Sequence, residues 1–224
     1  MPHGGVIWSI TIMIAIIDYR AGNLTSVKRA LDSIGRESVI TSDYRQIADA
    51  DRVIFPGVGA AGKAMSDLKS SKLDIALKEA FKDKRPILGI CLGTQIILDA
   101  SLENNTKCIG LVKGLVKKFP DNLRDSKGRK LKVPHMGWNM VNFKDTHPVF
   151  EGVVPDSEFY FVHSYYPAPE SADKVLGETS YGITFASVIL SDNLVAMQFH
   201  PEKSGRPGLR ILENFCNWSG NNNA

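Results

Sequence analysis

Residues 86–100 read Pro-Ile-Leu-Gly-Ile-Cys-Leu-Gly-Thr-Gln-Ile-Ile-Leu-Asp-Ala, and this stretch decides the fold. Pro86–Ile90 is a short apolar run, typical of a strand that is buried on both faces. Leu92–Ala100 continues with apolar residues at helical spacing. Between them, Gly89-Ile90-Cys91-Leu92-Gly93 has the form G-x-C-x-G, the pattern of a sharp strand-to-helix turn that carries a nucleophile. The stretch therefore predicts a parallel strand that ends on a reactive cysteine at the start of a helix.

Strand and helix signals alternate on the N-terminal side of this turn. Apolar runs predict strands at residues 13–18, Ser38–Thr41 and Arg52–Phe55, the last halted by Pro56-Gly57. Helical spacing predicts helices from Leu24 to Ile34 and near Ala60–Leu68 and Leu73–Phe81. Strands that alternate with helices of this length indicate a parallel sheet with right-handed crossovers.

The second half of the chain has a different pattern. A polar turn at residues 121–129 is flanked by Leu111–Phe119 and Lys130–Pro134, and short strand signals follow it. These signals are Phe159–Val162, Lys174–Gly177, Thr184–Ile189 and Leu194–Phe199, before a last helix at Gly208–Trp218. We therefore expect an α/β fold, with a mostly parallel central sheet flanked by helices and an additional antiparallel strand region. One domain over residues 13–219 is expected, with residues 1–12 as a leader or alternative start and residues 220–224 as a tail.

Composition narrows the classes of function. The chain has 224 residues, of which 43% are hydrophobic, and a net charge of +3, which gives no electrostatic case for nucleic acid or an anionic membrane. The longest apolar run, residues 6–17, is shorter than the roughly 20 residues of a membrane-spanning helix. Three cysteines form no disulfide framework and fit a reducing compartment, so we expect a cytoplasmic protein. No zinc spacing, phosphate loop or dinucleotide fingerprint is present, so neither a metal nor a cofactor is expected.

A cysteine nucleophile needs a base that also serves as an acid for the leaving group. His200 follows the predicted strand Leu194–Phe199, and Glu202 stands where its carboxylate can orient the imidazole. The alternative is that Cys91 is a small buried hydrophobic residue, a common fate of free cysteine. The glycine loop Pro56-Gly57-Val58-Gly59 is either a plain turn or, with the Leu92 amide, a source of oxyanion donors.

Two other histidines have weaker interpretations. His163 stands at the end of a predicted strand and could line the same cleft, whereas His135 is expected to be a structural or surface residue.

Taken in order, residues 56–59, 89–95 and 200–202 resemble the class I, triad-type glutamine amidotransferases, which have a flavodoxin-like fold. A narrower resemblance is to the glutaminase subunits of imidazole glycerol phosphate synthase, which serve histidine biosynthesis. It depends on Asp18-Tyr19-Arg20-Ala21-Gly22-Asn23-Leu24, Pro134-His135-Met136-Gly137-Trp138-Asn139, His163-Ser164-Tyr165-Tyr166 and Gln198-Phe199-His200-Pro201-Glu202-Lys203-Ser204-Gly205.

The resemblance implies roles for particular residues. It implies a catalytic triad of Cys91, His200 and Glu202, which hydrolyses L-glutamine to L-glutamate and ammonia through a cysteine thioester. It implies that ammonia passes to a cyclase subunit in a heterodimer. The remaining implied positions are Gly57, Val58, Gly59 and Leu92 for the oxyanion; Gln95, Ser164 and Tyr165 for the substrate; and Asn23, Trp138 and Lys203 for the partner interface.

Three other functions remain open on the sequence. The chain could be a glutaminase that serves another synthase, one that makes pyridoxal phosphate, anthranilate or guanylate. It could be a non-catalytic binding module, although the intact Cys91, His200 and Glu202 speak against this. It could also be a cysteine peptidase or esterase on a related fold, which would hydrolyse esters without turning over glutamine.

Overall fold

The computed structural model describes residues 12–20 and 22–221. Most of the predicted leader, residues 1–12, and most of the tail, residues 220–224, lie outside the described residues. The boundaries of the domain at 13–219 therefore stay a prediction. None of the helices in the described ranges is long and apolar enough to cross a membrane.

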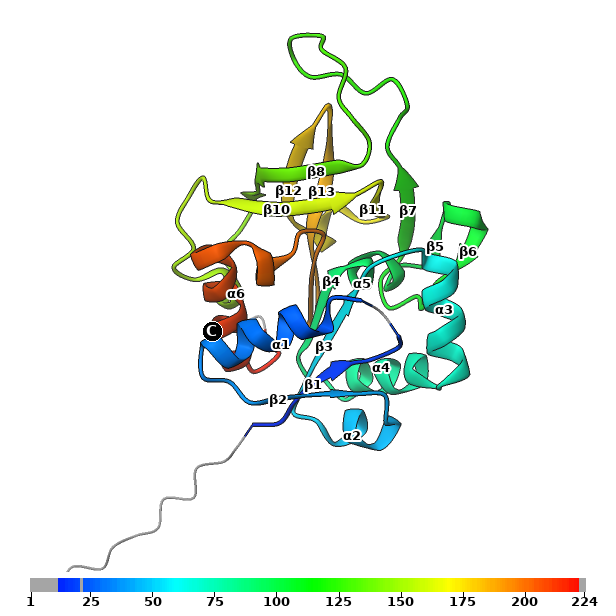
Figure 1. The fold of residues 1–224 in the computed structure, drawn as a ribbon, viewed down its shortest axis with the longest axis vertical. Coiled ribbons are helices and arrows are strands. Elements are labelled where there is room, and N and C mark those ends of the chain that lie inside the picture. Colours follow the sequence, from blue (N-terminus) through cyan, green and yellow to red (C-terminus); the bar gives the residue numbers. More distant parts are fainter. Residues whose placement is uncertain (1–11, 21, 222–224) are drawn as a thin grey trace, which may run out of the picture.

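An eight-stranded sheet in the order β2-β1-β3-β4-β14-β13-β12-β9 forms the centre of the molecule (Figure 1). The strands from β2 to β14 in that order pair in parallel, and those from β14 to β9 pair antiparallel. This confirms the predicted parallel sheet with an antiparallel region. The strands are β1 (Ile14–Ile17), β2 (Ser38–Thr41), β3 (Arg52–Gly57), β4 (Ile87–Cys91), β9 (Asn142–Phe143), β12 (Val175–Tyr181), β13 (Ile183–Ser191) and β14 (Leu194–Met197).

Helices cover both faces of the parallel part, which explains the continuous apolar runs in its strands. Successive side chains of a strand point to opposite faces, so Ile14 and Ile16 pack into one hydrophobic cluster, and Ala15 and Ile17 pack into the other. The first cluster includes α1 (Leu24–Ser33) and α6 (Gly205–Asn217). The second includes α2 (Tyr44–Asp49), α3 (Ala61–Ser70), α4 (Leu73–Lys82) and α5 (Leu92–Ile96).

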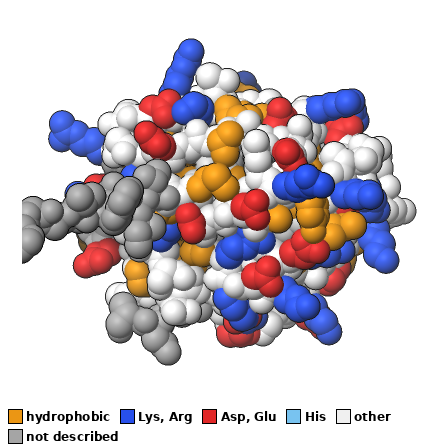
Figure 2. Space-filling view, turned by 90° about the horizontal axis from the view of Figure 1, so that it is seen from below, with side chains coloured by type: hydrophobic (Ala, Val, Ile, Leu, Met, Phe, Trp, Pro, Cys, Tyr) orange, Lys and Arg blue, Asp and Glu red, His pale blue; other side chains and the backbone are white. Residues whose placement is uncertain are grey.

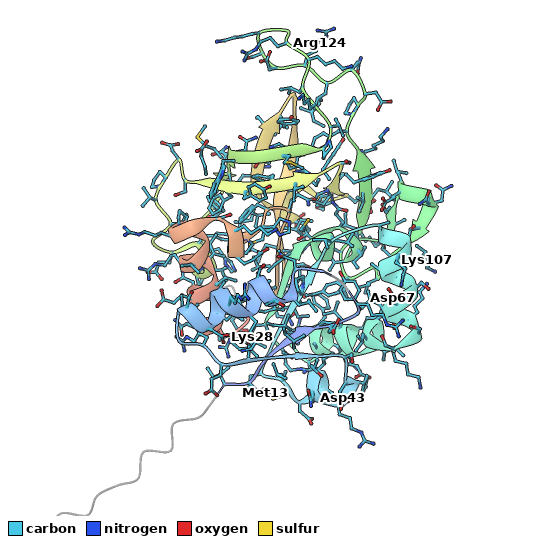
Figure 3. All side chains as sticks on the ribbon, viewed as in Figure 1. Met13, Lys28, Asp43, Asp67, Lys107 and Arg124 are labelled. Carbon is cyan, nitrogen blue, oxygen red and sulfur yellow. The ribbon has the colours of Figure 1, made fainter. Side chains whose placement is uncertain are left out.

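Two smaller sheets lie beside the antiparallel end. One is the antiparallel pair β8 (His135–Met140) and β10 (Glu158–His163). The other has the order β11-β7-β5-β6 and contains β5 (Ala100–Ser101), β6 (Thr106–Lys107), β7 (Gly114–Lys118) and β11 (Tyr165–Pro169). The segment between β7 and β8, with Arg124 near its tip, projects away from the sheets (Figures 1 and 3). Short 3-10 turns complete the fold: η1 (Glu103–Asn105), η2 (Pro148–Phe150), η3 (Ala172–Lys174) and η4 (Pro201–Lys203).

Two local predictions are wrong. The helix predicted over Leu92–Ala100 ends at Ile96, because the carbonyls of residues 96–98 accept hydrogen bonds from the amides of residues 109–112. β3 does not stop before Pro56-Gly57, because the fixed φ of proline suits an extended backbone, and Gly57 still pairs with Cys91. Lys130–Pro134, which follows the polar turn, contacts the opposite side of that turn through the bridge Arg124–Lys130 and through the hydrogen bond from the Leu131 amide to the Leu123 carbonyl.

Figure 2 shows the underside of the molecule as drawn in Figure 1, where Lys and Arg side chains are interspersed with Asp and Glu side chains. This mixture agrees with the small net charge of +3 and gives the face no field of a single sign.

A buried polar chain joins β8 and β10 to β11. His163 Nδ1 lies 2.8 Å from the Tyr165 carbonyl oxygen, His135 Nδ1 lies 3.0 Å from His163 Nε2, and Asn139 Nδ2 lies 3.3 Å from His135 Nε2. A carbonyl oxygen only accepts, so Nδ1 of His163 carries the hydrogen, and Nε2 of the neutral ring accepts one from His135. Burial lowers the pKa of His135 to about 4 and that of His163 to about 3. Both rings are therefore neutral at pH 7, and His135 is structural, as predicted.

This chain predicts an acid-sensitive contribution to stability. The pKa of His163 is lower in the folded chain than in the unfolded chain, so the unfolded state binds protons first as the pH falls below about 6.5. The free energy of unfolding should fall by up to about 1.4 kcal/mol per pH unit for this ring between pH 6 and pH 4. Urea denaturation at several pH values, compared with His163→Asn, isolates this share of the slope. Parallel stability curves for the two proteins over that range would contradict a neutral buried ring.

Candidate active site

Cys91 ends β4 and immediately precedes α5, with φ 53° and ψ −106°. Non-glycine residues rarely adopt this conformation, and it costs of the order of 1–3 kcal/mol. The flanking glycines let neighbouring strands approach the turn: a Cβ on Gly93 would lie 1.9 Å from the Phe55 carbonyl oxygen, and one on Gly89 would lie 2.8 Å from Ala196 Cβ. The G-x-C-x-G pattern thus forms the strained turn that the sequence predicts, with β3 and β14 packed against it.

His200 immediately precedes η4 and Glu202 lies within it, and their side chains form a buried pair. Nδ1 of His200 lies 2.7 Å from Oε1 of Glu202, and the two side chains are 1% and 0% exposed. Two hydrogen bonds hold the backbone of His200. The His200 amide donates to the Tyr160 carbonyl, and Ser204 Oγ donates to the His200 carbonyl. The short η4 turn brings the carboxylate back to the ring, which is the arrangement expected from the sequence.

The electrostatics of this pair favour a charged imidazole. Burial lowers the pKa of His200, but Cys91 and Glu202 raise it by more, so the net pKa is above its ordinary value. Nε2 of His200 is buried and has no hydrogen-bond partner among the described residues. Oε1 of Glu202 also accepts a hydrogen bond from Asn23 Nδ2, which helps to hold the carboxylate. The ring thus keeps one nitrogen fixed and the other available for a proton.

A pocket of about 380 Å³ opens at Cys91, a volume suited to a small ligand. Six other predicted site residues line it with Cys91, namely Val58, Gly59, Leu92, Gln95, Ser164 and Tyr165. Gly57 lies opposite Cys91 in the sheet and is covered by the Tyr19 ring. A larger hollow of about 1160 Å³ is lined by residues 140–157 and includes none of the predicted site residues.

The three predicted interface residues lie near the His200–Glu202 pair. Asn23 donates to Glu202 directly, as described above. The ring centroids of Trp138 and Tyr160 are 6.0 Å apart. The Nζ atom of Lys203 also lies 6.0 Å from the centroid of the Tyr160 ring. Trp138 and Lys203 are exposed, so together with Tyr160 they form a surface close to the site.

Sequence reasoning assigned no role to two residues of the site. Glu103 lines the pocket and also accepts a hydrogen bond of 2.7 Å from the Ala61 amide. Gln198 is fully buried, and its Nε2 donates to Cys91 Sγ over 3.7 Å. Gln198 lies two residues before His200, at the end of a predicted strand, and this position is the signal that could have identified it. Among the described residues, no group of His, Cys, Asp and Glu side chains could hold a metal ion.

Comparison with known proteins agrees with this geometry. The curated "Imidazole glycerol phosphate synthase subunit HisH" of Maridesulfovibrio salexigens is 50% identical over 203 residues, which cover 91% of this chain and 95% of that protein. The protein of the same name from Neisseria meningitidis serogroup B is 47% identical over 210 residues, covering 91% and 99%. Among solved structures, that of PurLQS from Thermotoga maritima has a TM-score of 0.69 at 17% identity, covering 93% of this chain and 99% of that chain, and shares the fold.

A family model also matches the chain and confirms the resemblance read from the motifs. Residues 15–218 match the model described as glutamine amidotransferase class-I, a span that includes β1, the turn at Cys91 and the His200–Glu202 pair. The chain belongs to the class-I glutamine amidotransferase family.

Proposed function

We propose that this chain is the glutaminase subunit of an imidazole glycerol phosphate synthase, which hydrolyses L-glutamine to L-glutamate and ammonia and delivers the ammonia to a cyclase subunit for histidine biosynthesis. The observation that carries the proposal is the strained Cys91 beside the buried His200–Glu202 pair, at the wall of a small pocket. The similarity to curated HisH proteins over nearly their whole length supports the narrower assignment. Cys91 must stay reduced, which fits the cytoplasm.

The chemistry follows from the residues at the pocket. The Cys91 thiolate attacks the side-chain carboxamide carbon of glutamine, and the oxyanion accepts hydrogen bonds from the amides of Leu92 and the Gly57–Gly59 loop. His200, whose raised pKa favours the imidazolium, gives its Nε2 proton to the departing ammonia. His200 then takes a proton from water as the water attacks the thioester. The carbon–sulfur bond breaks, its electron pair returns to sulfur, and glutamate leaves.

The pocket wall supplies groups for the rest of the substrate. Gln95, Ser164 and Tyr165, which carry polar groups, line the pocket together with Val58 and Gly59. The carboxylate of Glu103 at the same wall suits the α-ammonium group of an amino acid, because opposite charges attract strongly in a partly buried site. We therefore assign these four residues to glutamine binding.

The cyclase subunit is proposed to cover the outer face of β8 and β10. Met136, Trp138 and Met140 alternate along β8 and are 62%, 53% and 52% exposed, so three large apolar side chains stand in one row. Large exposed apolar patches on soluble proteins mark interaction sites. Lys203 at the edge of this row adds a positive charge, and Asn23 connects the region to Glu202.

Removing the nucleophile tests the reaction. Cys91→Ser should lower ammonia release from glutamine by at least about 10³-fold, measured with a cyclase partner and its substrate present, because a serine hydroxyl at neutral pH is a far weaker nucleophile. Cys216→Ser, a buried cysteine of α6, is the matched control and should retain activity. A Cys91→Ser protein that turns over glutamine like its parent would refute the mechanism.

Removing the charge of Glu202 tests the role of the pair. Glu202→Gln keeps the shape of the side chain but removes one influence that raises the pKa of His200, so the imidazolium is lost at lower pH. We expect kcat to fall by about 10²–10⁴-fold and the high-pH limb of its pH profile to move to lower pH. Glu213→Gln, in an exposed ion pair, is the control. A normal kcat with an unmoved limb would remove Glu202 from the mechanism.

Trimming the apolar row tests the partner surface. Trp138→Ala should weaken the binding of the cyclase subunit by at least about tenfold in Kd, because tryptophan at the centre of an interface commonly contributes this much. The Kd is measured by calorimetric titration of the chain with the cyclase subunit. The variant should keep its fold, because the Trp138 side chain is half exposed. Ile75→Ala, an exposed apolar residue on α4, should leave Kd unchanged. Equal weakening by both variants would place the partner elsewhere.

A further inference from the structure

The side chain of Gln198 donates a hydrogen bond to the sulfur of Cys91. It directly follows β14, its amide donates to the Ser187 carbonyl over 2.9 Å, and its side chain is completely buried. The distance of 3.7 Å from Nε2 to Sγ is reasonable for sulfur, which is a larger acceptor than oxygen. A buried carboxamide in this position contacts the atom that must become the nucleophile.

The orientation of this carboxamide is fixed by a neighbouring acceptor. Nε2 of Gln95 lies 2.8 Å from the Tyr165 carbonyl oxygen, which only accepts, so the nitrogen of Gln95 must face it. The same Nε2 donates its second hydrogen to Oε1 of Gln198 over 3.0 Å. With its oxygen held by Gln95, Gln198 can present only its NH₂ group to Cys91. The hydrogen bonds from Gln95 to the Tyr165 carbonyl and to Gln198 therefore require that Gln198 places a donor at the sulfur.

A hydrogen-bond donor near Cys91 Sγ would help to stabilise the thiolate. α5, which starts at Leu92, has five residues instead of the nine predicted, so its dipole offers a thiolate less stabilisation than a full helix would. His200 also acts on the sulfur, because Cys91 is among the groups that raise the pKa of His200. A hydrogen bond from a neutral donor to a charged sulfur is about twice as strong as one between neutral groups. Gln198 supplies this interaction without adding a charge to the buried site.

We propose that Gln198 is a further catalytic residue, whose carboxamide donates to Cys91 Sγ and stabilises the thiolate both before attack and when it leaves the thioester. The assignment rests on the proposed function only in taking Cys91 as the nucleophile. In the first step the thiol proton passes to His200 Nε2, and Gln198 holds the sulfur that remains. In the second step water attacks the thioester carbon, the electron pair of the carbon–sulfur bond returns to sulfur, and Gln198 again meets the developing charge.

Alkylation of the isolated chain tests the proposal without glutamine or a partner. Iodoacetamide reacts with thiolates, so the alkylation rate of Cys91 as a function of pH, followed by mass spectrometry, reports the fraction of thiolate. Burial raises the pKa of Cys108 and of Cys216 to about 11, so both remain thiols up to about pH 10 and do not obscure the reaction of Cys91. Gln198→Met, which has nearly the same shape but no donor, should move the midpoint for Cys91 up by about one to two pH units.

Matched variants separate this effect from a change in packing. Gln46→Met makes the same substitution at an exposed position of α2 and should leave the midpoint where it is. Gln198→Glu keeps the oxygen that Gln95 binds but replaces the donor with an acceptor, and it should raise the midpoint at least as far. A folded Gln198→Met or Gln198→Glu protein with the parental midpoint overturns the proposal, even if its glutamine turnover is reduced.

A measurement on the unsubstituted chain covers the case in which both variants fail to fold. In a ¹⁵N-labelled protein, the carboxamide signals of Gln198 should shift with the same midpoint as the alkylation of Cys91, and signals that do not respond to that titration overturn the proposal. These measurements also separate a failure of the Gln198 proposal from a failure of the proposed glutaminase function. A chain that alkylates as expected but releases no ammonia from glutamine would refute the glutaminase assignment and leave the role of Gln198 at the sulfur standing.

Discussion

The positive φ of Cys91 is the constraint on which the site depends. A residue in this conformation persists only where the surroundings hold it. β3 and β14 do so by packing on Gly93 and Gly89, where no side chain would fit. The same strand order sets the chemistry, because the carboxyl ends of parallel strands share one edge of the sheet. β3 ends at Gly57, β4 ends at Cys91, and β14 leads directly into Gln198 and His200. The Gly57–Gly59 loop, Cys91 and His200, which are the proposed oxyanion loop, nucleophile and base, come together because three neighbouring parallel strands end at the same edge.

A single acceptor, the Tyr165 carbonyl oxygen, orients the polar groups on both sides of it. On one side it accepts from Gln95, and this orders Gln198 toward the sulfur. On the other side it accepts a hydrogen bond from Nδ1 of His163. Nε2 of His163 must then accept a hydrogen bond from His135. Buried polar chains of this kind are costly unless every member is satisfied, and here each step determines the next. The directions of the hydrogen bonds at this wall of the pocket therefore follow from one carbonyl oxygen.

Much of this molecule is predictable from its sequence, and the exceptions have physical causes. β1, β2, α1 and α4 fall where buried runs and helical spacing place them, because local pattern and burial agree there. The helix after Cys91 is shorter than its apolar pattern suggests, because residues 109–112, distant in sequence, take its carbonyls. β8 and β11 escaped prediction: β8 turns its large apolar side chains outward, and β11 contains two prolines.

The site divides in the same way. Motifs locate Cys91, His200 and Glu202, since their spacing reflects the turn and the strand end that carry them. No local sequence pattern identifies Gln198, because its orientation depends on residues that are distant along the chain. Gln95, which binds its oxygen, is 103 residues away from Gln198. Tyr165, which orients Gln95, is 70 residues away from Gln95.

The outward row on β8 and the inward side chains of His135 and Asn139 lie on opposite faces of one strand, and this gives the proposed partner surface a direct structural relation to the pocket. Met136, Trp138 and Met140 face out, whereas His135 and Asn139 make the inward hydrogen bonds that lead to Tyr165. Any displacement of the β8 backbone by a bound subunit acts on both sets at once, because alternate side chains share the same peptide groups. From the Tyr165 carbonyl the next contacts are Gln95, Gln198 and the sulfur of Cys91. The route from the outer face to the nucleophile thus crosses the β8 backbone and then passes through four side chains and the Tyr165 carbonyl. The four side chains are those of His135, His163, Gln95 and Gln198, and each contact after the strand is a directional hydrogen bond.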